Sequence, residues 1–87
     1  MIKVIAHELS KNEFGLEVRG VPEPLLAYKA LMDRLLLSFK DQNSFEIINF
    51  TPNENRQTCS LQLRVLDSQL DLFKALIKSL ESDGLLI

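Results

Sequence analysis

Residues 14–39 read FGLEVRGVPEPLLAYKALMDRLLLSF, and the spacing of the hydrophobic residues changes partway along this stretch. In its first part apolar and polar residues alternate, and this period of two predicts a half-buried β-strand over 14–21. A Pro-Glu-Pro sequence ends the strand and suits a helix entrance, because proline is tolerated in the first turn, where amides lack partners. Apolar residues then recur at helical spacing, which predicts a helix to about Lys40.

Two strand pairs are predicted around this helix. Residues 2–9 alternate in the same way and are expected to form a hairpin with 14–21. Residues 45–50 are predicted to form a short strand, and 58–66 a longer one. The segment between them, 51–56, holds the densest cluster of turn-forming residues in the chain and is expected to be a mobile loop.

A second helix is predicted after the second strand pair. Either Asp67 or Ser68 is expected to cap its start, because a side-chain oxygen there can accept from an unpaired amide of the first turn. Asp83 and Gly84 are expected to end it, since glycine is the usual left-handed stop. The final residues 85–87 are apolar, and we expect them to pack back onto the core.

The two halves of the chain, about 2–40 and 45–83, align with each other at a shift of 45 residues without a gap. Matched leucines carry little weight, because two amphipathic helices of one length align on pattern alone. The identical pairs that pattern explains less well are Arg19/Arg64, Lys29/Lys74 and Ala30/Ala75. We expect an internal duplication, with convergence of pattern as the alternative.

In the order ββαββα, these elements predict an α+β fold: one four-stranded antiparallel sheet with both helices on one face. Right-handed crossovers and a pseudo-two-fold favour the strand order first, second, fourth, third, a ferredoxin-like architecture with its chain order circularly permuted. The longer second and fourth strands are expected at the centre. The name describes an architecture and implies no iron or redox chemistry. The length of 87 residues suits a single domain, 1–87.

Composition narrows the possible partners. Ten basic against twelve acidic residues give a net charge of -2, so nucleic-acid binding is not expected, because such domains usually carry a basic excess. The longest nearly apolar stretch, 25–39, is broken by charged residues, and no membrane span is expected. The start of the chain lacks a signal-peptide pattern, and the single Cys59 cannot form an intramolecular disulfide. Both features favour a cytoplasmic location.

Groups that could carry catalysis are few. His7 is the only histidine, and Cys59, the only thiol, is expected to face the core beside Leu61 and Leu63. No Cys or His residues stand at metal-ligand spacing, and the three glycines are isolated. We therefore expect no enzyme activity, no metal and no cofactor.

The first helix is apolar on two faces. The expected core stripe consists of Leu25, Tyr28, Leu31, Met32, Leu35 and Phe39. The residues beyond that stripe are Leu26, Ala30, Leu36 and Leu37. In the second helix, the positions equivalent to Leu26, Leu36 and Leu37 hold Asp71, Glu81 and Ser82. A leucine strip where the sister helix is acidic or polar indicates a buried contact.

The leading hypothesis is therefore a non-enzymatic interaction or regulatory module whose protein partner docks on this strip. A second copy of the same chain is the favoured partner, since two-fold homodimers are the commonest assembly. The alternatives are that the tail 85–87 folds over the strip, or that the helix sits deeper in the core.

The open face of the sheet is the second candidate site. Arg19 and Arg64 are expected to be neighbours across the central strands, where they could hold an anion or phosphate between them. Lys3 and His7 are expected on one flank of the pair. Ile48 and Phe50 are expected on the other, where the single aromatic gives weak support to stacking of nucleic-acid bases. The alternative is a solvated, salt-bridged surface, with Glu17 and Gln62 close by.

Overall fold

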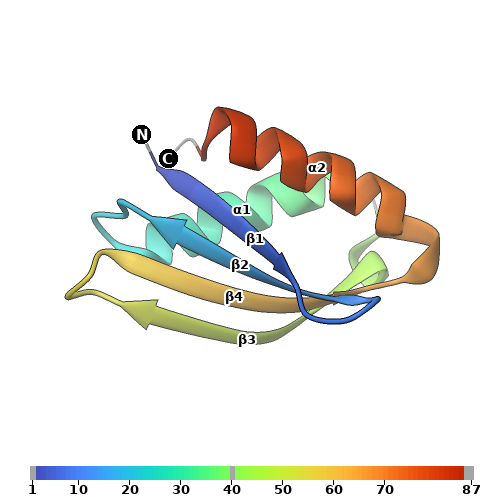
Figure 1. The fold of residues 1–87 in the computed structure, drawn as a ribbon, viewed down its shortest axis with the longest axis horizontal. Coiled ribbons are helices and arrows are strands. Elements are labelled where there is room, and N and C mark those ends of the chain that lie inside the picture. Colours follow the sequence, from blue (N-terminus) through green and yellow to red (C-terminus); the bar gives the residue numbers. More distant parts are fainter. Residues whose placement is uncertain (1, 40, 86–87) are drawn as a thin grey trace.

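The computed structural model describes residues 2–39 and 41–85, which form an antiparallel sheet covered by two helices (Figure 1). In chain order the elements are β1 (Lys3–Glu8), β2 (Glu13–Arg19), α1 (Pro24–Ser38), β3 (Phe45–Asn53), β4 (Thr58–Val65) and α2 (Leu70–Asp83). Two short 3₁₀ turns, η1 (Gln42–Ser44) and η2 (Asp67–Gln69), precede β3 and α2. The predicted α+β class and element order are confirmed.

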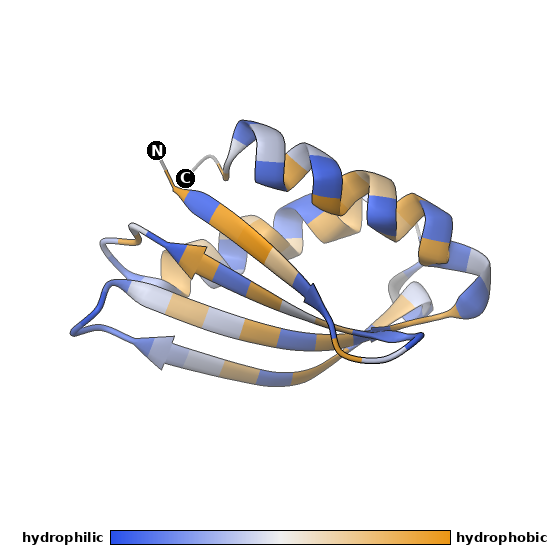
Figure 2. Ribbon diagram, in the orientation of Figure 1, coloured by the Kyte–Doolittle hydropathy of each residue, from blue (hydrophilic) through white to orange (hydrophobic). Residues whose placement is uncertain are grey.

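The sheet has the order β1-β2-β4-β3, and every neighbouring pair is antiparallel. This is the predicted order, with β2 and β4 at the centre. Both helices lie on the same side of the sheet in Figure 1. Alternate residues of the central strands are buried under them, and Figure 2 shows the resulting alternation of hydrophobic and hydrophilic bands. The other face of the sheet is therefore open.

One cluster of buried apolar side chains fills the space between sheet and helices. The helix α1 contributes Ala27, Leu31 and Leu35, spaced four residues apart, so they share one face. Aromatic rings join the layers at one end of the core. The ring of Phe73 in α2 lies 4.7 Å from that of Phe14 in β2 and 6.2 Å from that of Phe39, which follows α1.

The third strand differs from its prediction. It was expected to be short and to end at Phe50, but β3 runs nine residues, from Phe45 to Asn53, and is the longest of the four described strands. A β-bulge between Ile47 and Asn49 inserts Ile48 as an unpaired residue. Because a bulge adds one residue to one strand, it reverses the alternation that follows it.

The start of α2 also differs. We expected Asp67 or Ser68 to cap the helix, but these residues form η2, and the helix begins at Leu70 without a side-chain cap. The Asp67 carboxylate instead accepts a 2.7 Å hydrogen bond from Asn12 Nδ2, in the turn between β1 and β2. The carboxylate that could have capped the helix thus ties the first hairpin to the end of β4.

Candidate interaction surface on α1 and the open face of the sheet

The outer side of α1 is rich in exposed leucine. Its buried face is centred on Leu31, and at 100° per residue six residues fall within about 60° of the opposite direction. We call this set the outer face of α1; it consists of Leu25, Leu26, Lys29, Asp33, Leu36 and Leu37. All six are exposed, and the leucines are 64%, 44%, 40% and 79% accessible at positions 25, 26, 36 and 37. The expectation that Leu25 belongs to the core is wrong.

The predicted strip is therefore open to solvent in a single copy of the chain. Leu26, Leu36 and Leu37 are exposed, and Ala30 is half-buried beside them. The alternative in which the helix sits deeper in the core is wrong for the three leucines. The expectation for the tail is met at Leu85, which is buried and pairs with Ile2. Leu86 and Ile87, the rest of the tail, lie outside the described residues.

The sister helix α2 is less apolar on its outer side. Asp71, Glu81 and Ser82 stand where the first helix has three leucines, and all three are exposed. One leucine of α2, Leu72, is also exposed, by 44%. A lone exposed leucine needs no partner, whereas four on one helix face, even in two pairs separated by Lys29 and Asp33, call for an explanation. The outer sides of α1 and α2 therefore differ in their number of exposed leucines, as the sequence comparison predicts.

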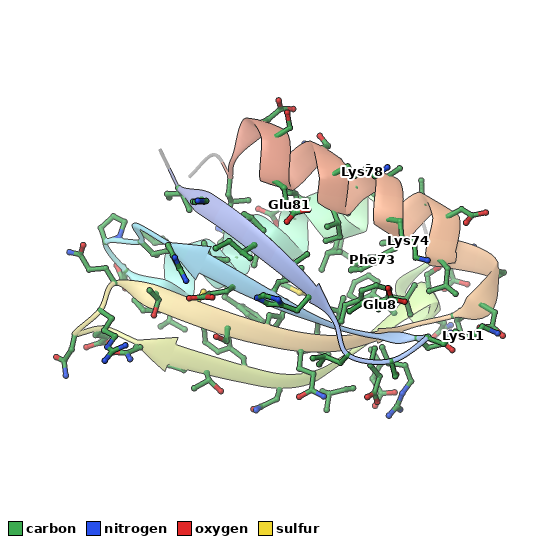
Figure 3. All side chains as sticks on the ribbon, viewed as in Figure 1. Glu8, Lys11, Phe73, Lys74, Lys78 and Glu81 are labelled. Atoms are coloured by element: carbon green, nitrogen blue, oxygen red, sulfur yellow. The ribbon has the colours of Figure 1, made fainter. Side chains whose placement is uncertain are left out.

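A groove runs between α2 and the edge strand β1 (Figure 3). Its volume is about 290 Å³, and Phe14 and Ile77 contribute its apolar wall. Its charged residues are Glu8, Lys74, Lys78 and Glu81. The Glu81 carboxylate accepts a 3.2 Å hydrogen bond from the amide of Ala6 and so occupies the strand edge. The sequence carries no local signal for this contact, because helical periodicity shows only that Glu81 lies on the side of the helix away from its apolar stripe.

On the open face, the two arginines do not meet. Arg19 lies opposite Thr58 in the register of β2 and β4, and Arg64 lies opposite Glu13. The two positions are six residues apart along the strands, or about 20 Å at the usual rise per residue. The predicted adjacency is wrong, because matching positions in an antiparallel pair run in opposite directions. Arg19 and Arg64 cannot grip one small anion together.

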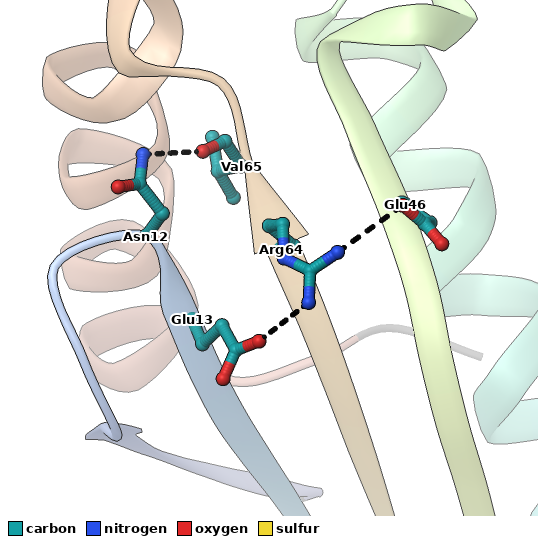
Figure 4. Close-up of polar contacts among 5 residues, drawn as sticks. All are labelled: Asn12, Glu13, Glu46, Arg64 and Val65. Carbon is teal, nitrogen blue, oxygen red and sulfur yellow. Dashed lines mark hydrogen bonds and ion pairs between the residues drawn. The ribbon is translucent and has the colours of Figure 1, made fainter.

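Each arginine is engaged by carboxylates instead. Arg64 lies 2.8 Å from Glu13 Oε1 and 3.6 Å from Glu46 Oε2, so it bridges the strands on either side of β4 (Figure 4). Arg19 Nε donates to Glu17 Oε1 at 2.9 Å. That hydrogen bond is the main reason that the pKa of the Glu17 carboxyl is lowered. These pairs match the alternative of a salt-bridged, solvated surface.

The flanking residues fall as follows. Lys3 and His7 are exposed, and in the β1–β2 register they lie opposite Arg19 and Gly15. His7 borders a shallow depression of about 230 Å³ on the open face, whose other lining residues include Glu17 and Gln62. The depression is lined by both charged and amide side chains, so no single ligand class is favoured by its charge.

Phe50 does not lie on the open face. The bulge at Ile48 brings Phe50 opposite the buried Leu61, and its ring packs 4.7 Å from that of Tyr28 in α1. The prediction that placed Ile48 and Phe50 together on the open face is wrong for Phe50. The aromatic side chain considered for base stacking is thus part of the contact between sheet and helix.

The remaining reactive group, Cys59, faces the core as expected and is 1% exposed. Burial raises the pKa of its thiol, which keeps the sulfur protonated and poorly nucleophilic. Within residues 2–39 and 41–85, no three His, Cys, Asp or Glu side chains gather as a metal site would require. No helix in the same ranges combines the length and the hydrophobicity needed to cross a membrane.

Comparisons of the chain with protein-family models, with curated proteins and with solved structures gave no match.

Proposed function

We propose that this protein is a non-enzymatic interaction or regulatory module that forms a two-fold homodimer through the outer face of α1. The observation that carries the proposal is the exposure of Leu25, Leu26, Leu36 and Leu37 on one helix face. Four exposed leucines on one helix face, in two pairs with Lys29 and Asp33 between them, are typical of a protein contact, because exposure of apolar side chains to water is unfavourable.

The internal comparison supports a specific role for α1. We propose that the chain arose by duplication within a permuted ferredoxin-like fold, which makes α2 a natural reference for α1. Both helices bury one stripe against the same sheet, but α1 carries four exposed leucines and α2 carries one, Leu72. Each helix has its own buried stripe, and the fold requires this stripe. The exposed leucines of α1 lie outside it, so they serve another purpose.

A second copy of the chain suits the charges of this face. Lys29 and Asp33 are exposed among the leucines, and they give the face one positive and one negative charge. Such a face is electrically neutral and offers another copy a partner for each of its charges. A strongly acidic or basic partner would place a charge of the same sign against one of these two residues.

Because the chain has a single, unpaired cysteine, a cytoplasmic location is part of the proposal.

The test is the mass of the full chain in solution, measured by sedimentation over protein concentrations from about 1 μM to 1 mM, since one helix face makes a small interface. The wild type should approach twice 9.9 kDa as the concentration rises. The double variant Leu26→Asp/Leu37→Ser copies the residues of α2 at both positions and should remain a folded monomer.

The matched control is Leu72→Asp, since Leu72 and Leu26 are equally exposed. It should leave the dimer intact. Should the double variant fail to fold, Leu37→Ser alone replaces the most exposed of these leucines and should still weaken the dimer. A wild type that stays monomeric at every concentration would overturn the proposal, and so would a folded double variant that remains dimeric.

A further inference from the structure

The outer face of α1 has a symmetry of its own about Leu31, the residue at the centre of the buried face. Lys29 and Asp33 lie two residues before and after it, and the leucine pairs 25–26 and 36–37 lie five to six residues away on either side. Reading outward in both directions therefore gives a charge and then two leucines, with the charges of opposite sign.

We propose that two copies pair through antiparallel α1 helices, with Lys29 of each copy facing Asp33 of the other. This inference rests on the proposed homodimer and specifies its arrangement. A two-fold axis perpendicular to antiparallel helices brings position 31 − n of one copy level with position 31 + n of the other. Lys29 and Asp33 lie about 3 Å along the helix axis from Leu31, so the opposite charges meet at the same level.

The leucines meet by the same symmetry. At each end of the helix pair, Leu25 and Leu26 of one copy lie level with Leu36 and Leu37 of the other. At 100° per residue, Leu25 and Leu36 lie on one side of the outer face of α1, and Leu26 and Leu37 lie on the other side. The two-fold axis keeps these sides together, so Leu25 lies on the same side of the interface as Leu36 of the second copy. Leu26 likewise lies on the same side as Leu37 of the second copy. Two four-leucine clusters would thus enclose two ion pairs, which shields the ion pairs from water.

The parallel arrangement is disfavoured by the same residues. It would place Lys29 against Lys29 and Asp33 against Asp33, which repel each other. Within residues 2–39 and 41–85, the ion pairs involve other side chains, and both of these charges extend into solvent. They are available for a contact between copies.

The experiment reverses the charges one at a time and together, with self-association measured by sedimentation. Lys29→Glu and Asp33→Lys should each raise the dimer dissociation constant about tenfold, because each change turns two attractive contacts into repulsive ones. The double variant Lys29→Glu/Asp33→Lys exchanges the charges and should return to within about threefold of the wild type. The control is Lys74→Glu, the same reversal at the equivalent position of α2, and it should leave the constant unchanged.

The outcomes separate this arrangement from the homodimer itself. A monomeric wild type overturns both proposals. A dimer that neither single reversal weakens, or that the double exchange fails to restore, overturns the antiparallel pairing and leaves the homodimer standing. Circular dichroism checks that each variant folds; should a reversal unfold the chain, the neutral changes Lys29→Gln and Asp33→Asn replace it and should weaken the dimer about threefold.

Discussion

The amide of Ala6 in the edge strand β1 donates a 3.2 Å hydrogen bond to the carboxylate of Glu81 in α2. Nearby, the amide of Leu85 donates to the carbonyl of Ile2, the residue just before this strand, at 3.1 Å. In an antiparallel pair, the backbone groups of alternate residues point to the same edge, so both contacts lie on the edge of β1 that faces away from β2. A free strand edge can pair with a strand of another molecule, and these two contacts block such pairing at the edge of β1.

Removal of the Glu81 carboxylate should therefore expose the edge of β1. Glu81→Leu is expected to lower the free energy of unfolding by about 1 kcal/mol or less, since one exposed hydrogen bond is lost. Hydrogen exchange at the Ala6 amide should quicken, and light scattering at high concentration should rise. Glu81→Gln is the control, because its amide oxygen can still accept. Equal exchange rates at Ala6 in both variants would show that the carboxylate does not protect this amide.

A second prediction concerns Asn12, which joins the first hairpin to the end of β4. Its Nδ2 donates to the carbonyl of Val65 at 2.8 Å and to Asp67 Oδ1 at 2.7 Å. Asn12→Ala should lower the free energy of unfolding by about 1 kcal/mol in urea titrations, because both bonds are lost. Asn43→Ala, at an exposed asparagine, should change it by less than about 0.5 kcal/mol. Similar losses in the two variants would contradict this role.

The Asn12 effect should depend on pH. The pKa of the Asp67 carboxyl is lowered, mainly by the hydrogen bond from Asn12 and next by the charge of Lys11. A lowered pKa in the folded state means that the ionised carboxylate contributes fully to the free energy of unfolding above the unfolded pKa of about 3.9. This contribution is lost as the pH falls below that value. The difference in stability between wild type and Asn12→Ala should accordingly narrow in acid. A difference that stays constant or widens in acid would mean that Asn12 does not lower the pKa of this carboxyl.

Much of the fold was predictable because strand and helix periods are visible over long stretches. The alternation of β2 and β4 and the helical spacing after Pro24 indicated the element order, and covering one sheet face with two helices left few topologies. The exposed strip of α1 was predictable for a related reason: the sister helix served as an internal reference for Leu26 and Leu37.

The errors came from features without a periodic signal. The bulge at Ile48 adds one residue to β3, and a single inserted residue is invisible in a short alternating run, so Phe50 was assigned to the wrong face. The separation of Arg19 and Arg64 depends on the register between β2 and β4. Two strands that are far apart in the chain set this register by core packing, which the pattern of either strand alone does not reveal.

The bulge leads to a third prediction, on the contact between β3 and α1. Phe50→Ala should lower the free energy of unfolding by about 1–3 kcal/mol, because it removes a half-buried ring that packs on Tyr28. Ile48→Ala, two residues away at an exposed position, should cost less than about 1 kcal/mol. The comparison by urea unfolding tests the bulge directly, since unbroken alternation would place both side chains on one face and make their losses alike.

The buried thiol of Cys59 gives a fourth prediction, on alkaline stability. Burial raises its pKa in the folded state, whereas the unfolded thiol ionises near pH 8.5. Above about pH 8.5, ionisation of the thiol therefore stabilises the unfolded state and not the folded state. The thiol leaves the free energy of unfolding unchanged below about pH 8.5 and lowers it as the pH rises further. Cys59→Ala removes this titration, so its free energy of unfolding should fall less steeply than that of the wild type between about pH 8 and 10. Native protein should also react far more slowly with a thiol reagent than protein in urea. Parallel alkaline slopes, or rapid labelling of the native protein, would mean that the thiol is accessible and ionises freely in the folded state.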